Sequence, residues 1–316
     1  MNLHQFRFLQ EAVRRKLNLT EAARALHTSQ PGVSKAIIEL ESELGVEIFS
    51  RHGKRIRKLT EPGVEVLRSV DIILREVANL KRIGQDYAAR DAGELTVAAT
   101  HTQARYKLPW AIAEFRRRMP AVQVRLIQGT PEQVAQAVRE ERADLGLASE
   151  SLQDAPDLLT LPCYSWQHLA VVPHGHPLCE RVEPTLAELA TYPLVTYEPT
   201  FAGRRQIDAA FAHAELQPQI VLEALDSDVL KTYVELGLGV GLIAEMAISP
   251  ERDTGLRALP VGHLFGQQLT RVAFKRGVLQ RNFVPLFTEL ISPRLPRKLV
   301  EQTLRGELDG QDVFSI

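Results

Sequence analysis

Apolar residues recur at intervals of three and four along the first part of the chain, which is the spacing of one buried helix face. Residues 3–17 show this pattern, and an alanine-rich segment follows them. A third segment, TSQPGVSKAIIELESELG, has its apolar stripe at Val33, Ile37, Leu40 and Leu44. Ser29 is a candidate N-cap for this helix, Pro31 is tolerated in its first turn, and Gly45 is typical of a helix end. The pattern predicts three short helices.

Two short helices joined by a tight turn form the helix-turn-helix arrangement, in which the second helix enters the DNA major groove. Polar residues that lead this helix can read base edges, because Gln pairs with adenine, Ser with several bases, and Lys with guanine or phosphate. The candidate DNA contacts are Thr28, Ser29, Gln30, Pro31, Ser34 and Lys35.

The segment VEIFSRHGKRIRKLT predicts a β-hairpin that turns at His52-Gly53. Five cations fall within eight residues here, namely Arg51, Lys54, Arg55, Arg57 and Lys58. A charge run alone is usually a solvated surface, but beside a helix-turn-helix it predicts a wing that follows the phosphate backbone. Arg51 and Lys54 are the candidate DNA contacts of this wing.

One long helix is predicted from Thr60 to Tyr87, with apolar residues at alternating spacings of four and three. The repeat comprises Val66, Val70, Ile73, Val77 and Leu80. Such a seam is typical of a coiled coil, and a lone helix with so apolar a stripe needs a partner. We therefore expect a homodimer through this helix, and packing of the seam against its own domain is the alternative.

From residue 91 onward, strands alternate with helices, which is typical of parallel or mixed α/β sheets with crossover helices. The stretch is long enough for two lobes, lobe I over about 91–164 and 267–292 and lobe II over about 165–266. In open α/β sheets a ligand sits beyond the carboxyl ends of the strands. The segment Thr100-His101-Thr102-Gln103, which follows the first strand, is the expected ligand site.

Charge is distributed unevenly over these parts. Residues 1–90 hold 16 Lys and Arg against 11 Asp and Glu, a net of +5, whereas residues 91–316 hold 22 against 28, a net of −6. A basic front part is consistent with nucleic-acid contact. Two cysteines exclude a disulfide scaffold and a Cys-rich zinc site.

The composition also bears on location. No apolar run approaches a membrane span, and the first residues lack the apolar stretch of a signal peptide. We expect a cytoplasmic protein with no membrane contact, no cofactor and no metal.

The segment TSQPGVSKAIIELESELGVEIFSR resembles the helix-turn-helix of LysR-type transcriptional regulators, and the resemblance covers the whole chain. Segments of the second part closely resemble the CysB-like branch of that family: THTQARYKLP (100–109), QGTPEQVAQAV (128–138), FAGRRQID (201–208) and DVLKTYVELGLGVGLIAEMA (228–247). The resemblance implies a winged helix-turn-helix domain at 1–59, a linker helix at 60–90, and a two-lobed, periplasmic-binding-protein-like effector domain at 91–316.

The same resemblance implies a function. Members of this branch bind promoter DNA as homotetramers, bend it, and control genes of cysteine biosynthesis and of sulfate or sulfonate assimilation. RNA polymerase is an implied further partner. The implied effector is a small anion between the lobes: an acylserine, sulfate, thiosulfate or adenosine phosphosulfate.

Neutral hydrogen-bond donors near a helix N-terminus suit such an anion, because they hold it without the pH dependence of a salt bridge. Ser149 matches a hydroxyl position of the family pocket. Residue 202 is Ala, where sulfur-assimilation members can carry Thr, so the second lobe offers Gly203 and main-chain N–H groups there. The expected effector contacts are Thr100, His101, Thr102, Gln103, Ser149, Ala202 and Gly203.

Three alternatives stay open: a LysR-type regulator of an unrelated pathway, a solute-binding protein on the two-lobed fold, and an enzyme. The sequence contains no G-x-S-x-G, H-E-x-x-H, P-loop or C-x-x-C motif. GLGVG at 237–241 follows a predicted helix and precedes a strand, whereas a dinucleotide loop needs the reverse order. His174 and His176 lack nearby third and fourth metal ligands. We therefore expect a regulator that is not an enzyme.

Overall fold

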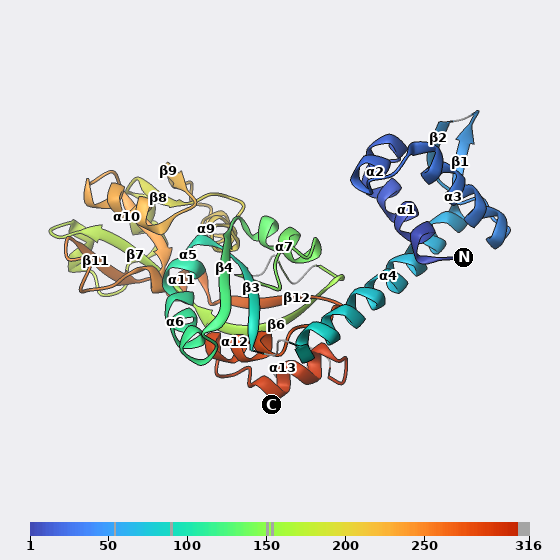
Figure 1. Ribbon diagram of the computed structural model, residues 1–316. Coiled ribbons are helices and arrows are strands. Elements are labelled where there is room, and N and C mark those ends of the chain that lie inside the picture. Colours follow the sequence, from blue (N-terminus) through green and yellow to red (C-terminus); the bar gives the residue numbers. More distant parts are fainter. Residues whose placement is uncertain (54, 89–90, 150–151, 153–154, 309–316) are drawn as a thin grey trace. The chain divides into compact units, whose positions relative to one another are not determined.

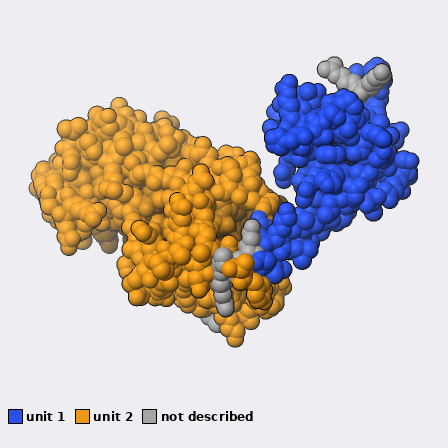
Figure 2. All heavy atoms as spheres, viewed as in Figure 1, with its two compact units in different colours: residues 1–85 blue, residues 86–316 orange. Residues whose placement is uncertain are grey.

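The computed structural model describes the chain except for residues 54, 89–90, 150–151, 153–154 and 309–316 (Figure 1). It forms two compact units, unit 1 over residues 1–85 and unit 2 over residues 86–316, which Figure 2 shows in different colours.

Unit 1 begins with three helices, α1 (Leu3–Arg14), α2 (Leu19–Ala25) and α3 (Gln30–Leu44). Asn18 caps α2, since its side-chain oxygen accepts from the main-chain N–H groups of the first turn, and Ser29 caps α3 in the same way. Gly45 ends α3 in the left-handed conformation, with φ at 71°. The three predicted helices and the caps proposed for α3 are confirmed.

The predicted hairpin is present as β1 (Phe49–His52), which pairs antiparallel with β2 (Arg55–Leu59). Lys54 lies outside the described residues. Ile48 and Phe49 are fully buried and join the hairpin to the core of the three helices.

The long helix α4 (Glu61–Ala88) corrects one prediction. Val70 is 2% exposed and belongs to the core formed by α1, α2 and α3. Ile73 and Leu80, on the same predicted seam, are 40% and 68% exposed. The assignment of Val70 to a dimer seam was wrong, because the first turns of α4 close the core of unit 1. Ile73 and Leu80 further along the helix are left uncovered, as is Val64 in its first turn.

Lobe I of unit 2 is a sheet with the strand order β4-β3-β5-β12-β6. Its strands are β3 (Ala92–Ala99), β4 (Ala121–Gln128), β5 (Leu145–Ser149), β6 (Leu158–Trp166) and β12 (Gln268–Lys275). Strands β3, β4 and β5 are parallel, and β12 runs antiparallel to both of its neighbours. The predicted alternation of parallel strands and helices is confirmed here.

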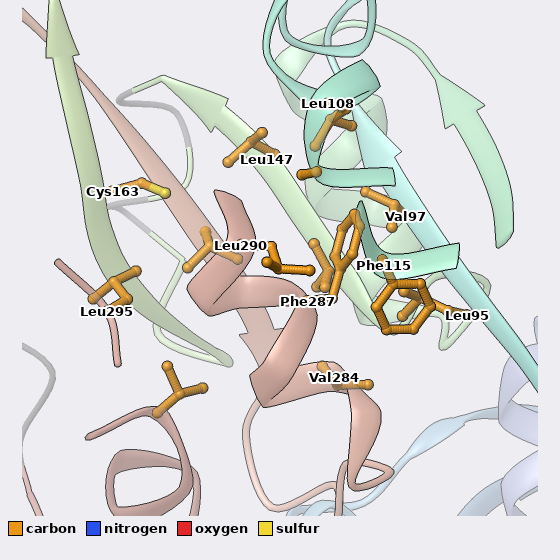
Figure 3. Packing of buried hydrophobic residues seen from close by; sticks show 14 of the residues in the cluster. Leu95, Val97, Leu108, Phe115, Leu147, Cys163, Val284, Phe287, Leu290 and Leu295 are labelled. Carbon is orange, nitrogen blue, oxygen red and sulfur yellow. The ribbon is translucent and has the colours of Figure 1, made fainter. Parts of the chain in front are cut away.

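Helices cover both faces of this sheet. They are α5 (His101–Tyr106), α6 (Leu108–Arg118), α7 (Pro131–Arg139), α12 (Phe283–Ile291) and α13 (Arg297–Leu304). Lobe I has two hydrophobic cores, and the larger one is shown in Figure 3. In it Phe115 packs edge-on to Phe287, with ring centroids 5.3 Å apart, and the Cys163 thiol is buried nearby. Burial raises the pKa of Cys163 to about 12. Because α13 packs on α12, lobe I continues past the expected end at residue 292.

Lobe II has the strand order β11-β7-β10-β8-β9. Its strands are β7 (His168–Pro173), β8 (Leu194–Tyr197), β9 (Ile220–Ala224), β10 (Val240–Ala244) and β11 (Leu256–Pro260). Its α-helices are α8 (Leu186–Ala190), α9 (Ala202–His213), α10 (Ser227–Glu235) and α11 (Gly262–Phe265), and the 3₁₀ turns are Pro177–Glu180 and Glu245–Ala247. The GLGVG segment turns from α10 into β10, with φ of Gly237 at 79°.

The chain passes from lobe I to lobe II between β6 and β7, and it returns between β11 and β12. The two crossings lie side by side, because Trp166 and Gln268 are partners in the antiparallel pairing of β6 and β12. Strands β6 and β11 were not among the predicted elements. Among the described residues, no helix combines the length and the apolar character that a bilayer crossing requires.

Candidate functional site

The first candidate surface is the exposed start of α3. The buried stripe of α3 faces the core, so the residues between its members face outward. Of the predicted DNA contacts, Thr28, Ser29, Gln30, Pro31 and Lys35 are exposed, and Ser34 is half-buried.

A polar hollow lies beside this surface, between the starts of α2 and α3 and the strand β2. Gln30 lines it together with Lys16 and Arg57. Lys16 and Leu17 have φ values of 51° and 67°, an unusual conformation for residues other than glycine. The hollow thus brings two cations to the leading residue of α3. Sequence reasoning missed Lys16, because only the turn between α1 and α2 places it there.

Arg51 has a partner that the sequence did not indicate. Its guanidinium lies 2.8 Å from Glu41 of α3. The other oxygen of Glu41 accepts from the main-chain N–H groups of Ile48 and Phe49, at 2.9 and 3.0 Å. Glu41 and Arg51 therefore tie the hairpin to α3, and Arg51 positions the hairpin rather than extending freely from it.

The second candidate site is a cavity between the lobes of unit 2. It is lined by Thr100, Thr102, Gln103, Pro131, Ser149, Trp166, Tyr197, Phe201, Gly203 and Ala244. Its volume is about 30 Å³. One water needs roughly 10–15 Å³ by the same measure, so the space holds about two waters or one very small ligand. Every described residue that lines the cavity is uncharged.

Five of the seven predicted effector contacts line the cavity. These are Thr100, Thr102, Gln103, Ser149 and Gly203. His101 instead contacts Asp226 of lobe II, with 3.1 Å between Nε2 and Oδ2. Ala202 begins α9, and its side chain lies outside the described part of the structure.

Lobe I brings its donors together through its sheet. Strand β3 ends at Ala99, α5 begins directly after Thr100, and Ser149 ends the neighbouring strand β5. Since parallel strands present their carboxyl ends at one edge, these side chains meet there.

Lobe II contributes the start of α9. Among the described side chains, none caps this helix, whereas Thr130 caps α7. A Cβ added to Gly203 would lie 2.8 Å from His168 Nε2 and 3.1 Å from Trp166 Cη2. Glycine therefore lets the first turn of α9 approach the wall of the cavity closely. The positive end of the helix dipole favours an anion at this position.

A chain of hydrogen bonds supports Thr102. Its Oγ1 lies 3.3 Å from Ser227 Oγ, which lies 2.8 Å from the Tyr197 hydroxyl. The Tyr197 hydroxyl accepts from the main-chain N–H of Ala244 at 3.0 Å. Burial raises the pKa of Tyr197.

Ser149 and Gln103 belong to a second network. Trp166 Nε1 donates to Ser149 Oγ at 3.3 Å, and Gln103 Nε2 donates to Thr270 Oγ1 at 3.4 Å. Thr270 and Ser149 lie 3.4 Å apart, and Tyr164 donates to the Gln103 carbonyl oxygen. Sequence reasoning missed Trp166, Tyr197 and Ser227. The signals available were that Tyr197 ends strand β8 at its carboxyl end and that Ser227 begins a helix.

Charged contacts join the lobes outside the cavity. Asp228 of α10 lies 3.0 Å from Arg105 Nε and accepts from the Tyr106 hydroxyl at 2.5 Å. Burial, followed by the bond to Asp228, raises the pKa of Tyr106 to about 12. Together with His101–Asp226, these contacts form a clasp between α5 and the start of α10.

His168 is fully buried where the chain enters lobe II, between the rings of Trp166 and Phe265. Neither of its ring nitrogens has a hydrogen-bond partner among the described residues. Burial lowers the pKa of His168 to about 4, so the ring is neutral at physiological pH. Within the described residues, no three His, Cys, Asp or Glu side chains gather as a metal site would require.

Two family descriptions match the chain. Residues 3–64 match "Bacterial regulatory helix-turn-helix protein, lysR family", and residues 88–295 match "LysR substrate binding domain".

Named relatives match over nearly their full length. The chain is 62% identical over 313 residues to the HTH-type transcriptional regulator CysB of Burkholderia cenocepacia, covering 99% of this chain and 100% of that one. It is 49% identical to the HTH-type transcriptional regulator SsuR of the same organism, covering 96% and 99%. The crystal structure of the cofactor-binding domain of the Cbl transcriptional regulator superposes with a TM-score of 0.65 at 45% identity, covering 67% of this chain and 93% of that one.

Proposed function

The chain belongs to the LysR family of transcriptional regulators, and from this premise we propose that it regulates genes of sulfur metabolism under the control of a small anion bound between its lobes. The identity to the regulators CysB and SsuR supports the sulfur assignment. The target genes we propose are those of cysteine biosynthesis and of sulfate or sulfonate assimilation.

In this proposal residues 1–59 bind DNA, residues 60–90 form the helix that links the two parts of the chain, and residues 91–316 bind the effector. Thr28, Ser29, Gln30, Pro31, Ser34 and Lys35 approach base edges and the adjoining phosphates. Lys16 and Arg57 contact phosphates beside Gln30, because they line the same hollow. Arg51 acts through the position of the wing, given its bond to Glu41. Lys54 is proposed as a phosphate contact on its sequence position alone.

The exposed apolar side chains of α4 support a homodimer through this helix. They include Ile72, Ile73, Leu80 and Ile83. Two such dimers form the proposed tetramer, which bends promoter DNA and contacts RNA polymerase.

The observation that carries the effector proposal is the cavity lined by uncharged donors at the start of α9. Neutral hydroxyl, amide and main-chain N–H groups hold an oxyanion when they converge on it. The volume of about 30 Å³ favours the smallest candidate, sulfate, over an acylserine or adenosine phosphosulfate. A larger effector requires the lobes to separate further.

The effector acts by its preference for one arrangement of the lobes. A ligand shifts a conformational equilibrium only by its difference in affinity for the two states. An anion that contacts Thr102 of lobe I and the start of α9 in lobe II binds the closed arrangement more tightly. Lobe closure then changes how dimers pack and how far apart the paired DNA-binding domains lie.

The experiment is titration calorimetry on the full chain with sulfate, thiosulfate, O-acetylserine, N-acetylserine and adenosine phosphosulfate in parallel. We expect sulfate to bind and Thr102→Ala to lose that binding. Acylserine binding that is lost in Thr102→Ala would place the protein among cysteine-biosynthesis regulators instead. A variant that binds every ligand as the parent does would remove the cavity from the proposal.

A further inference from the structure

The hydrogen-bond chain behind Thr102 has a fixed direction. It starts at the main-chain N–H of Ala244, which can only donate, and its acceptor is the Tyr197 hydroxyl at 3.0 Å. Tyr197 is 4% exposed, so its own proton needs an acceptor inside the protein. Ser227 Oγ lies 2.8 Å away and takes that role. The raised pKa of Tyr197 agrees with a phenol that keeps its proton.

The direction continues through Ser227, which is fully buried. Among the described residues, its hydroxyl forms hydrogen bonds with Tyr197 and Thr102. Since Ser227 accepts from Tyr197, its proton goes to Thr102 Oγ1 at 3.3 Å. Thr102 then has its own proton left over. Because Thr102 lines the cavity, that proton is available to a ligand there.

Ser149, like Thr102, accepts a hydrogen bond from a group behind it, here through a separate set of contacts. The indole N–H of Trp166 can only donate, and it donates to Ser149 Oγ at 3.3 Å. Thr270, which accepts from Gln103, lies 3.4 Å from Ser149 and has a proton to give it. When Thr270 donates to Ser149, the serine also keeps its proton for the cavity. Each hydroxyl then accepts a bond from behind and offers its proton to the cavity.

We propose that Tyr197 and Ser227 are positioning residues that hold Thr102 as a donor toward the cavity, so that the site selects oxyanions without a proton over oxyanions that carry one. The inference rests on the proposed function, because it takes the cavity to be the anion site. Sulfate and sulfonate groups carry no proton near neutral pH, whereas inorganic phosphate carries at least one. A protonated oxygen that lies on the Thr102 proton would place one donor against another.

Such a mismatch leaves a buried polar group unpaired, which costs about 1–3 kcal/mol, or roughly 5- to 150-fold in affinity. We therefore expect the full-length protein to bind sulfate at least about tenfold more tightly than phosphate. This ratio of affinities is the quantity to measure, because general damage to the fold weakens both anions together.

The test compares Tyr197→Phe with the parent by titration calorimetry, using sulfate and inorganic phosphate separately. Without the phenol hydroxyl, Ser227 can accept from Thr102, and Thr102 can present a lone pair to the ligand. We expect the ratio of sulfate to phosphate affinity to fall at least about fivefold. Tyr192→Phe is the matched control, since it removes the same hydroxyl from the core of lobe II away from the chain, and it should leave the ratio unchanged.

Ser227→Ala breaks the same chain at its middle and should lower the ratio in the same direction. If both variants fold, bind sulfate and keep the parental ratio, the positioning proposal is overturned while the anion site stands. If the parent binds neither anion, or Thr102→Ala binds sulfate as the parent does, the anion site itself fails and the positioning proposal fails with it. Thermal unfolding of each variant verifies that the comparison is made on folded protein.

Discussion

Substitutions at two positions of α4 should separate folding of the DNA-binding unit from dimerisation. Val70 and Leu80 follow the same apolar repeat, yet Val70 is 2% exposed and Leu80 is 68% exposed. Val70→Ala removes two buried methyl groups from the core that α4 shares with α1 and α3. Leu80→Ala removes apolar surface that unit 1 leaves uncovered.

The magnitude follows from the buried carbon. At about 0.8 kcal/mol for each buried CH₂ group, Val70→Ala costs about 1.6 kcal/mol before the cavity that it leaves is counted. We therefore expect a loss of about 2 kcal/mol in the free energy of unfolding of unit 1. For a domain of this size, that loss lowers the unfolding temperature by roughly 8–16 °C.

Amide hydrogen exchange, measured by mass spectrometry on the full chain, separates loss of folding stability in unit 1 from loss of dimerisation. Val70→Ala should speed exchange in α1 and α3, and Leu80→Ala should leave that exchange unchanged. Sedimentation should show weaker association for Leu80→Ala. Unchanged exchange in the Val70 variant, or a fully intact dimer in the Leu80 variant, would refute the division of the helix into two roles.

Two further changes test the DNA surface and the buried histidine. Gln30→Ala should cost about 1–3 kcal/mol of binding free energy on the specific DNA site and leave non-specific binding intact. Arg57→Ala should weaken binding to both kinds of DNA and reduce the slope of log affinity against log salt concentration by about one. Fluorescence anisotropy on both kinds of DNA measures these changes, and equal losses on both for Gln30→Ala would contradict base reading. His168 has a pKa of about 4 when folded, against about 6.5 when unfolded, so protonation of the unfolded chain should lower the free energy of unfolding as pH falls from about 6.5 to 4. His168→Leu should flatten this pH dependence in urea unfolding, and a slope equal to the parent's would count against a neutral buried ring.

Local signals in the sequence sufficed for most elements of the fold. Capping at Ser29 and Gly45 depends on neighbours within one helical turn, and the alternation of strands and helices depends on local apolar periods. Strand β6 contains Pro162, which a strand pattern does not favour, and it was missed. The burial of Val70 was missed for another reason, since one apolar stripe can face a partner helix or its own domain.

The candidate anion site was predicted in part. Thr100, Thr102 and Gln103 follow one strand directly, so the position of a strand end was enough to indicate them. Tyr197 and Ser227 reach the cavity from lobe II, and the contact between Thr102 and Ser227 joins residues 125 positions apart. No local pattern encodes such a meeting. The direction of the hydrogen bonds depends on it entirely.

The clasp between α5 and α10 has a consequence for the timing of the response. His101, Arg105 and Tyr106 hold the start of α10 beside a cavity that admits about two waters. In the proposed mechanism the lobes separate to admit the anion, and these contacts then have to part. Its association rate therefore levels off at the opening rate of the lobes as its concentration rises. On this proposal the bound state would persist for a time that the clasp sets, and brief dips in anion concentration would pass without a change at the promoter.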